Sequence, residues 1–438
     1  MTAAAPSPFL ASVARGYAAL GDSLGGGAPA AEVRRAALER FLAAGLPSGR
    51  DENWKYLMLR GLARQELTFA APGGRAQGLP EGAVALENAT RLVFVNGRLD
   101  AQRSSALPAP DGVRIESLRE TYRRDPELLA RSLPGDDRAD TRFALLNTAF
   151  VADGASIVLD AGKSPLLHVI FVSEAAEASF PRLSIRATGG ATGIVVEQHL
   201  TDGLRPRFVN SLTDIEVDHG SRVDLCRLHS LGTGAMQFDT LRARVGNDST
   251  FAMYSLGVGG DILRSDIEIG LEGSAATALL RGLLFTTGTQ HHELHAEIRH
   301  AVPETTSRTL VSTVVNDSGR AVCNSKVIVA PGARRSVSEQ SFRNLLLATS
   351  AEADTRPQLE IHNEDVKCSH GASTGRLDPN MLFYLESRGL DEATARALLT
   401  YAFVVDLLKA VPVAELSQAL ARRIAGELPA RDLIKEFI

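Results

Sequence analysis

The sequence predicts a mainly β fold with helical parts at both ends, in which short strands stack as the coils of a β-solenoid. Helical apolar patterns fill residues 1–85, and they return after Gly375. Between them, from about residue 90 to 361, short β-branched runs are separated by Gly, Asp and Asn. These runs recur at uneven intervals of roughly 25 to 33 residues, which is typical of stacked coils. A jelly roll or a β-sandwich would produce similar strands and stays open as an alternative.

The length of 438 residues is enough for two or three structural parts. We expect an N-terminal helical region over 1–85, a β core over 86–372 and a C-terminal helical domain over 373–438. With a net charge of −5 and 23% charged residues, the chain lacks the excess of positive charge that attracts nucleic acid or an anionic membrane surface. We therefore expect neither as a partner.

The three cysteines, Cys226, Cys323 and Cys368, are far apart in the chain and odd in number. They form neither a disulfide framework nor a CxxC metal clip, which favours a reducing compartment. The N-terminus lacks a signal-peptide pattern, and no run approaches the ~18 apolar residues of a membrane-spanning helix. We expect a cytoplasmic protein, with Cys323 as a core residue and Cys226 on a strand whose orientation is open.

The N-terminal region contains one well-marked helix. Glycines and Pro29 precede residues 30–44, where Val33, Leu38, Phe41 and Leu42 line one broad face. Gly45 is expected to end this helix.

The middle region begins with strand-like runs at 91–96, 156–160 and 167–172. Later runs repeat one form, in which an alternating strand is followed by a polar turn, a small residue and a second strand. The pair 215–217 and 221–223 is an example. Each such unit could bury its inward residues against the next coil.

Three helices are expected after Gly375. Asp378 and Pro379 form a plausible N-cap and first turn, and Gly389 follows the end of that helix. Asp391 caps a second helix, and residues 413–428 form a third. These helices could be a bundle packed on its own core or a docking platform for another protein, and composition leaves both open.

Two glycine motifs do not predict nucleotide binding. Gly162-Lys163-Ser164 lacks the earlier glycine of a phosphate-binding loop and runs directly into a proline, so this chain should not hydrolyse ATP. The run at 257–260 lacks the third glycine of a dinucleotide fingerprint and is interpreted as a turn.

Two clusters of titratable residues also have a structural interpretation. If His291, His292, His295 and His300 lie on one strand, they divide between its two faces, which favours separate structural roles. A row of carboxylates could resemble the groove of a polysaccharide-cleaving enzyme, although its alternation is more typical of the solvent face of a half-buried sheet. The row consists of Asp214, Glu216, Asp218, Asp266 and Glu268.

Cys368 and His370 form the most informative pair in the sequence. On a strand they would point the same way, which places two soft-metal ligand types on one surface. The same spacing also fits a buried small hydrophobe beside a satisfied core histidine. Two ligands are only half of a metal site, so a bound metal would need ligands from elsewhere.

The pair lies within an ordered set of motifs. These are Arg-Pro-Gln-Leu-Glu-Ile at 356–361, Glu-Asp-Val-Lys-Cys-Ser-His-Gly-Ala at 364–372 and Phe-Tyr-Leu-Glu-Ser-Arg-Gly at 383–389. In order and spacing they resemble the C-terminal core of the SufB/SufD family of iron-sulfur cluster assembly proteins. Looser matches run upstream through His295, His300, Ser307, Gln340 and 344–347. Leu46-Pro47 and Glu-Asn-Trp-Lys-Tyr at 52–56 resemble the SufD branch rather than the SufB branch.

The resemblance implies a right-handed parallel β-helix and a noncatalytic scaffold subunit. Such a subunit would pair with a SufB-like homologue through the β-helix, or with itself in isolation. It would bind a SufC-like ATPase, the partner that hydrolyses ATP, through its C-terminal helices, with Phe383, Tyr384, Arg388 and Gly389 as candidate contacts.

The resemblance also implies a cluster site at the heterodimer interface. His370 is the first candidate ligand there and Cys368 the second. The iron-sulfur cluster would be transient and shared with the partner, and none is expected to stay bound to this chain alone. The alternatives are a stand-alone metal-binding or storage protein, a SufB-like principal scaffold and the polysaccharide-cleaving enzyme.

Overall fold

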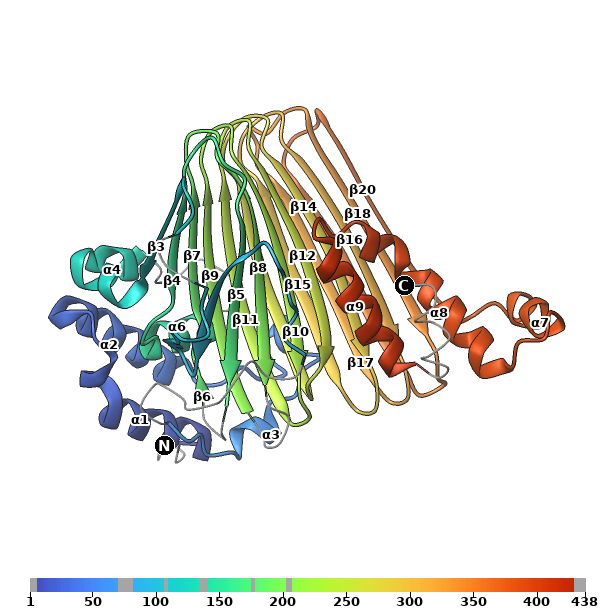
Figure 1. The fold of residues 1–438 in the computed structure, drawn as a ribbon, viewed down its shortest axis with the longest axis horizontal. Helices are drawn as coiled ribbons and strands as arrows, with labels where there is room; N and C mark the ends of the chain where they lie inside the picture. Colours follow the sequence, from blue (N-terminus) through green and yellow to red (C-terminus); the bar gives the residue numbers. More distant parts are fainter. Residues whose placement is uncertain are drawn as a thin grey trace.

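The computed structural model describes residues 6–69, 82–105, 109–131, 133, 141–174, 178–201 and 207–428, and is a parallel β-solenoid flanked by helices (Figure 1). The helices are α1 (Pro8–Leu20), α2 (Gly27–Ala44), α3 (Arg60–Ala63), α4 (Leu118–Arg124), α5 (Pro126–Arg131), α6 (Arg142–Phe150), α7 (Pro379–Ser387), α8 (Glu392–Lys409) and α9 (Ala414–Glu427).

The strands of the described residues form two sheets. Sheet A pairs, in order, β2 (Arg98–Leu99), β1 (Thr90–Val95), β5 (Leu166–Ser173), β8 (Thr192–Thr201), β10 (Arg222–Leu231), β12 (Thr250–Gly259), β14 (Thr277–Thr286), β16 (Thr306–Val315), β18 (Ser336–Leu346) and β20 (Val366–Gly375). Sheet B pairs β19 (Glu352–Ile361), β17 (Arg320–Val329), β15 (His291–His300), β13 (Ile262–Leu271), β11 (Ala235–Val245), β9 (Arg207–Val217), β7 (Arg182–Ala187), β4 (Ala155–Leu159) and β3 (Val113–Ser117), with β6 (Ala178–Ser179) beside β9.

The chain alternates between the two sheets, so each coil contributes one strand to sheet A and one to sheet B. From β8 onward every neighbour in a sheet is parallel, as in the pairs β10 with β12 and β11 with β13. Among the described strands, antiparallel pairing is confined to β1 with β2 and β3 with β4, at the N-terminal end. This parallel topology confirms the predicted solenoid and excludes the jelly roll and the antiparallel sandwich.

The interior of the solenoid is built from alternate residues of the strands. Leu225 of β10 and Leu241 of β11 are fully buried members of one apolar cluster that runs along the coils. A one-residue slip would turn every such side chain outward, so burial fixes the register of the coils. Cys323 belongs to this interior, which confirms its predicted core position.

The outer faces of the two sheets are covered by different helices. The N-terminal helices pack on sheet B around Trp54, whose indole lies against the rings of Phe143 and Phe238. Helices α8 and α9 pack on the outer face of sheet A. Cys226 belongs to the same buried apolar cluster on that face, so its thiol points away from the interior and yet is fully buried. The C-terminal helices are therefore not a separate bundle.

The predicted helix signals agree with the structure. Helix α2 ends before Gly45, whose φ of +68° is left-handed, and its buried face includes Leu38 and Phe41. The Asp378 side chain accepts a hydrogen bond from the Asn380 amide, and Asp391 accepts one from the Thr394 amide, so both are N-caps.

The prediction of a turn over 257–260 is wrong for residues 257 and 258. Gly257 lies within β12, and only Gly259 and Gly260 have the positive φ of a turn. A Cβ at Gly257 would lie 2.5 Å from Leu263 Cδ2, so this glycine serves close packing between the two sheets.

Candidate functional site

The solenoid has an open end, formed by β19 in sheet B and β20 in sheet A (Figure 1). Each is a 10-residue strand at the end of its sheet, paired with a described strand on one side only: β19 with β17, and β20 with β18. The other edge of each strand presents backbone N–H and C=O groups to its surroundings. Long exposed edges of this kind are ready to pair with another chain.

Cys368 and His370 lie on β20 and face the interior side of the last coil. Their register partners on β18 are Ser338 and Gln340, which are buried and share a strand face with Phe342 of the core. Parallel neighbours in register project to the same side of a sheet, so both side chains point inward. No further described coil covers them, and His370 is exposed while Cys368 is half-buried.

The two side chains have different surroundings. Cys368 packs against the edge of the apolar interior, and this burial raises the pKa of its thiol, opposed by a hydrogen bond involving the Ser338 backbone. The thiol is therefore protonated at neutral pH in the isolated chain. His370 lies beside Gln340, whose Nε2 donates to the Gln358 carbonyl at 3.3 Å while its buried Oε1 has no hydrogen-bond partner among the described residues.

The opening is held together across the two sheets by a buried amide. Asn344 Nδ2 donates to Thr355 Oγ1 of β19 at 2.8 Å and to Thr374 Oγ1 of β20 at 2.9 Å. Two edge strands that could otherwise separate are thereby fixed relative to each other. The sequence motifs predict no role for Asn344 or Thr355, although the alternation of β19 places Thr355 on the inner face, in register with Cys323.

Helix α7 lies beyond the last strands and projects from the body of the molecule (Figure 1). It has no buried residue, and Met381, Phe383 and Tyr384 are 57%, 72% and 57% exposed. The Arg388 guanidinium lies 5.2 Å from the centre of the Tyr384 ring, and Gly389 has a φ of +93°. An exposed apolar patch on a short projecting helix is typical of a protein contact.

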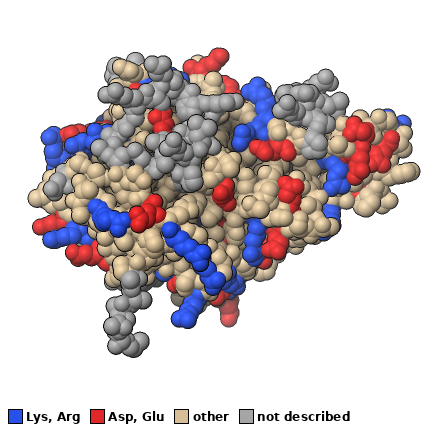
Figure 2. Space-filling view, turned by 90° about the horizontal axis from the view of Figure 1, so that it is seen from below, with Lys and Arg blue, Asp and Glu red and all other residues tan. Residues whose placement is uncertain are grey.

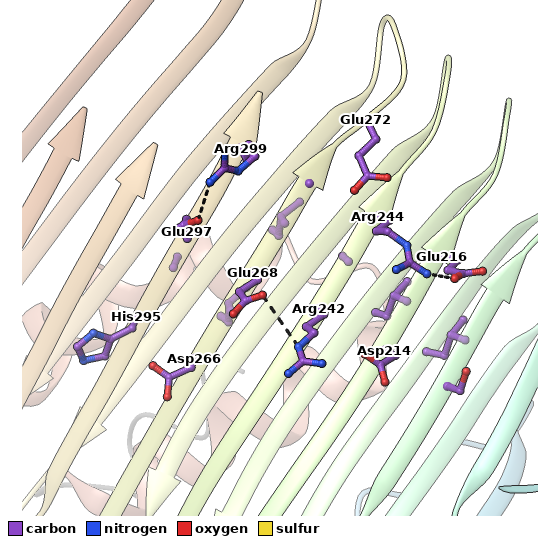
Figure 3. Close-up of a pocket in the computed structure, with 18 of the residues that line it drawn as sticks. Asp214, Glu216, Arg242, Arg244, Asp266, Glu268, Glu272, His295, Glu297 and Arg299 are labelled. Carbon is purple, nitrogen blue, oxygen red and sulfur yellow. Dashed lines mark hydrogen bonds and ion pairs between the residues drawn. The ribbon is translucent and has the colours of Figure 1, made fainter. Parts of the chain in front are cut away.

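Four of the five carboxylates in the row lie on the outer face of sheet B and line a cavity of about 1200 Å³, namely Asp214, Glu216, Asp266 and Glu268 (Figure 3). All five carboxylates are matched by arginines. The pairs are Asp214 with Arg182 (3.2 Å), Glu216 with Arg244, Asp218 with Arg186 (3.0 Å), Asp266 with Arg264 (2.8 Å) and Glu268 with Arg242 (4.0 Å). Paired carboxylates of this kind do not offer the acid and base of a glycosidase, which weakens the polysaccharide hypothesis.

The predicted division of the histidines is present on β15. His291 and His295 both contact Glu293, at 2.8 and 2.9 Å, on the outer face. His292 and His300 point inward, where His292 Nε2 is 2.9 Å from the Gly259 carbonyl and His300 contacts Thr305 and Ser307. All four therefore have structural partners.

On the face shown in Figure 2, the described residues do not form a continuous basic surface of the kind that binds a polyanion. Acidic and basic side chains are interspersed there among the described residues. No helix within the described ranges is both long enough and apolar enough to cross a membrane.

Comparison with known proteins gives a consistent result over most of the chain. Residues 170–403 match the family model "SUF system FeS cluster assembly, SufBD core domain", and residues 27–164 match "SufBD protein N-terminal region". The chain is 30% identical to the iron-sulfur cluster assembly protein SufD of Escherichia coli K12, over 90% of this chain and 92% of that protein. It is 27% identical to a SufBD family protein of Synechocystis, over 87% of each chain. A Mycobacterium tuberculosis SufBD family protein is also 27% identical, over 87% of this chain and 89% of its own length.

Proposed function

The chain belongs to the SufBD family of iron-sulfur cluster assembly proteins, and we infer that it is a scaffold subunit on which clusters are built together with other chains. The observation that carries this proposal is the presence of Cys368 and His370 on the inner face of an uncovered coil. The cluster is the cargo of this site. Because its three cysteines are free thiols, we expect the protein to function in a reducing compartment such as the cytoplasm.

The partner at the open end would be a SufB-like homologue. A second solenoid could continue both sheets by adding strands to β19 and β20, which would satisfy two long rows of backbone groups at once. Such a partner would also cover His370 and supply the ligands that a thiol and an imidazole lack. In the absence of that homologue, a second copy of this chain could occupy the same edge.

His370 and Cys368 would bind iron in different ways. The exposed imidazole of His370 can present a ring nitrogen to an iron ion. The Cys368 thiol, whose pKa is raised by burial, must lose its proton, and a bound iron ion promotes that loss. The cluster would therefore be held weakly by this chain alone and more strongly at the completed interface.

The ATPase would bind to helix α7. Phe383 and Tyr384 provide exposed apolar area, and Arg388 adds a cation beside the Tyr384 ring. We propose that ATP is hydrolysed by this SufC-like partner and that our chain contributes no catalytic group. A conformational change in the ATPase could be transmitted to the open end through α7, because α7 follows β20 within a few residues.

The test is cluster reconstitution on the complex of this chain with a SufB-like homologue and an ATPase. His370→Ala and Cys368→Ala should lower the iron and sulfide bound per complex, with His370→Ala having the larger effect, while the complex still copurifies. His219→Ala is the matched control, because His219 is an exposed histidine in a turn distant from the opening. Wild-type cluster loading in the His370→Ala, Cys368→Ala double variant would remove both residues from the site.

A further inference from the structure

A second group of metal-ligand side chains lies inside the solenoid, well before the open end. His199 of β8 and His229 of β10 are register partners in sheet A, and Asp239 of β11 faces them from sheet B. One ligand atom from each of the three residues lies within 4.8 Å of the other two. All three side chains are at most 2% exposed.

Several ring nitrogens of this group are buried without a partner. His199 Nε2 is 2.8 Å from Glu197 Oε1, but its Nδ1 has no hydrogen bond to any described residue. His229 Nδ1 is likewise without one. His229 Nε2 lies 2.6 Å from Asp239 Oδ2 without forming a well-directed hydrogen bond. Buried polar atoms in native proteins nearly always have a partner, so these nitrogens indicate a missing ligand.

The side chains around the group form hydrogen bonds to it and fix its position, as neighbouring side chains do around metal ligands. Glu197 contacts His199 and accepts hydrogen bonds from Arg227 at 3.0 and 3.2 Å. Asp239 accepts from Gln237 Nε2 at 2.8 Å, and also from the hydroxyls of Ser211 and Ser265. A metal-bound imidazole commonly donates its other N–H to a carboxylate, as His199 could to Glu197.

We propose that His199, His229 and Asp239 bind one divalent first-row transition-metal ion inside the solenoid. Two imidazole nitrogens and one carboxylate oxygen suit Zn²⁺ or Fe²⁺ and are a poor set for Mg²⁺ or Ca²⁺. The nearby ionisable groups are compatible with a cation, because among the described residues Glu197 and Asp239 bring two carboxylates to the group and Arg227 brings one guanidinium.

The ion would replace the direct contact between His229 and Asp239. Two ligands of one tetrahedral ion lie about 3.3 Å apart, so that contact would open by a fraction of an ångström. The group is closed to solvent in the folded chain, and the ion would enter as the chain folds. Its role is to tie coils of the solenoid together, independently of the proposed cluster site.

The test uses the untagged chain carrying Cys368→Ala and His370→Ala, so that a failure of the cluster proposal does not affect the result. The chain is produced in medium supplemented with Zn²⁺ or Fe²⁺, purified, dialysed against EDTA and analysed by inductively coupled plasma mass spectrometry. We expect about one tightly held ion per chain. A content below about a tenth of an ion per chain with both metals would overturn the proposal.

Substitutions of the proposed ligands test where the ion binds. His229→Gln and Asp239→Asn are each expected to lose it, and either one suffices if the other does not fold. His300→Gln is the matched control, because His300 is another fully buried, inward-facing histidine, lies outside the group and has a hydroxyl partner at each ring nitrogen. The control should keep the ion. Retention of a full equivalent in folded His229→Gln or Asp239→Asn would also overturn the proposal.

Discussion

At the scale of single residues, the three thiols of the chain differ mainly in what covers them. Cys226 lies in the buried apolar cluster on the outer face of sheet A and Cys323 lies inside the solenoid, whereas Cys368 lies at the open end. Burial raises the pKa of all three thiols, to about 12 for Cys323. The rate at which a thiol reagent modifies each cysteine should therefore depend mainly on how accessible that cysteine is to solvent.

Alkylation should reflect this difference. In the isolated folded chain, iodoacetamide should modify Cys368 first, because Cys226 and Cys323 must wait for local or global opening. Peptide mass spectrometry over time measures the three rates, and binding of the homologous partner should slow the reaction at Cys368 specifically. Equal rates for Cys226 and Cys368 in the folded chain would contradict the packing described above.

Buried neutral histidines should make the fold acid-sensitive. Burial lowers the pKa of His168, His292 and His300 to about 4 each, from an ordinary value of 6.5. Below pH 6.5 the unfolded chain takes up protons that the folded chain does not, so stability should fall as the pH drops from 6.5 to about 4, by up to about 1.4 kcal/mol per pH unit for each histidine. Although burial opposes it, Arg227 and His199 lower the pKa of Glu197 to about 2, so its contribution is lost only below about pH 4.5.

The measurement is denaturant unfolding at several pH values between 7 and 4.5. His292→Gln should give a shallower dependence than the wild type, whatever its stability at neutral pH. Stability that does not change across this range would show that these histidines are not buried in their neutral form.

At the scale of elements, local signals predicted the helices better than the interior of the solenoid. Asp378 and Asp391 act as N-caps through short-range hydrogen bonds, which sequence alone can indicate. Arg227 and Glu197 would be expected on the surface by their charge, yet they pair inside the solenoid. The exposure of His370 was also beyond sequence reasoning, because it depends on where the last coil ends.

Helix α7 is the element on which ATPase binding can be tested. Replacing Phe383 and Tyr384 with Ser should abolish copurification with the ATPase and leave the melting temperature almost unchanged, because neither side chain is buried. Met58→Ser is the matched control, since Met58 is 57% exposed, as Tyr384 is, and lies in the N-terminal part of the chain. Full ATPase binding by the double variant would remove α7 from that interface.

At the scale of the whole molecule, the two ends of the solenoid are different. Antiparallel strands and the N-terminal helices occur at one end, while β19 and β20 leave the other open. The family resemblance and the loose repeat together predicted the solenoid and its flanking helices. They could not predict the details of its open end, because the contacts of Asn344 with Thr355 and Thr374 join residues from three separate strands.

The central claim is that this open end joins a second solenoid and encloses the cluster site. Hydrogen-deuterium exchange of the chain, alone and with its SufB-like homologue, tests it most directly. We predict that the partner slows amide exchange in β19 and β20, including the amides around Cys368 and His370, while the outer face of sheet B near Asp214 and Asp266 is unchanged. Protection of that outer face with no change at 352–361 and 366–375 would contradict the claim.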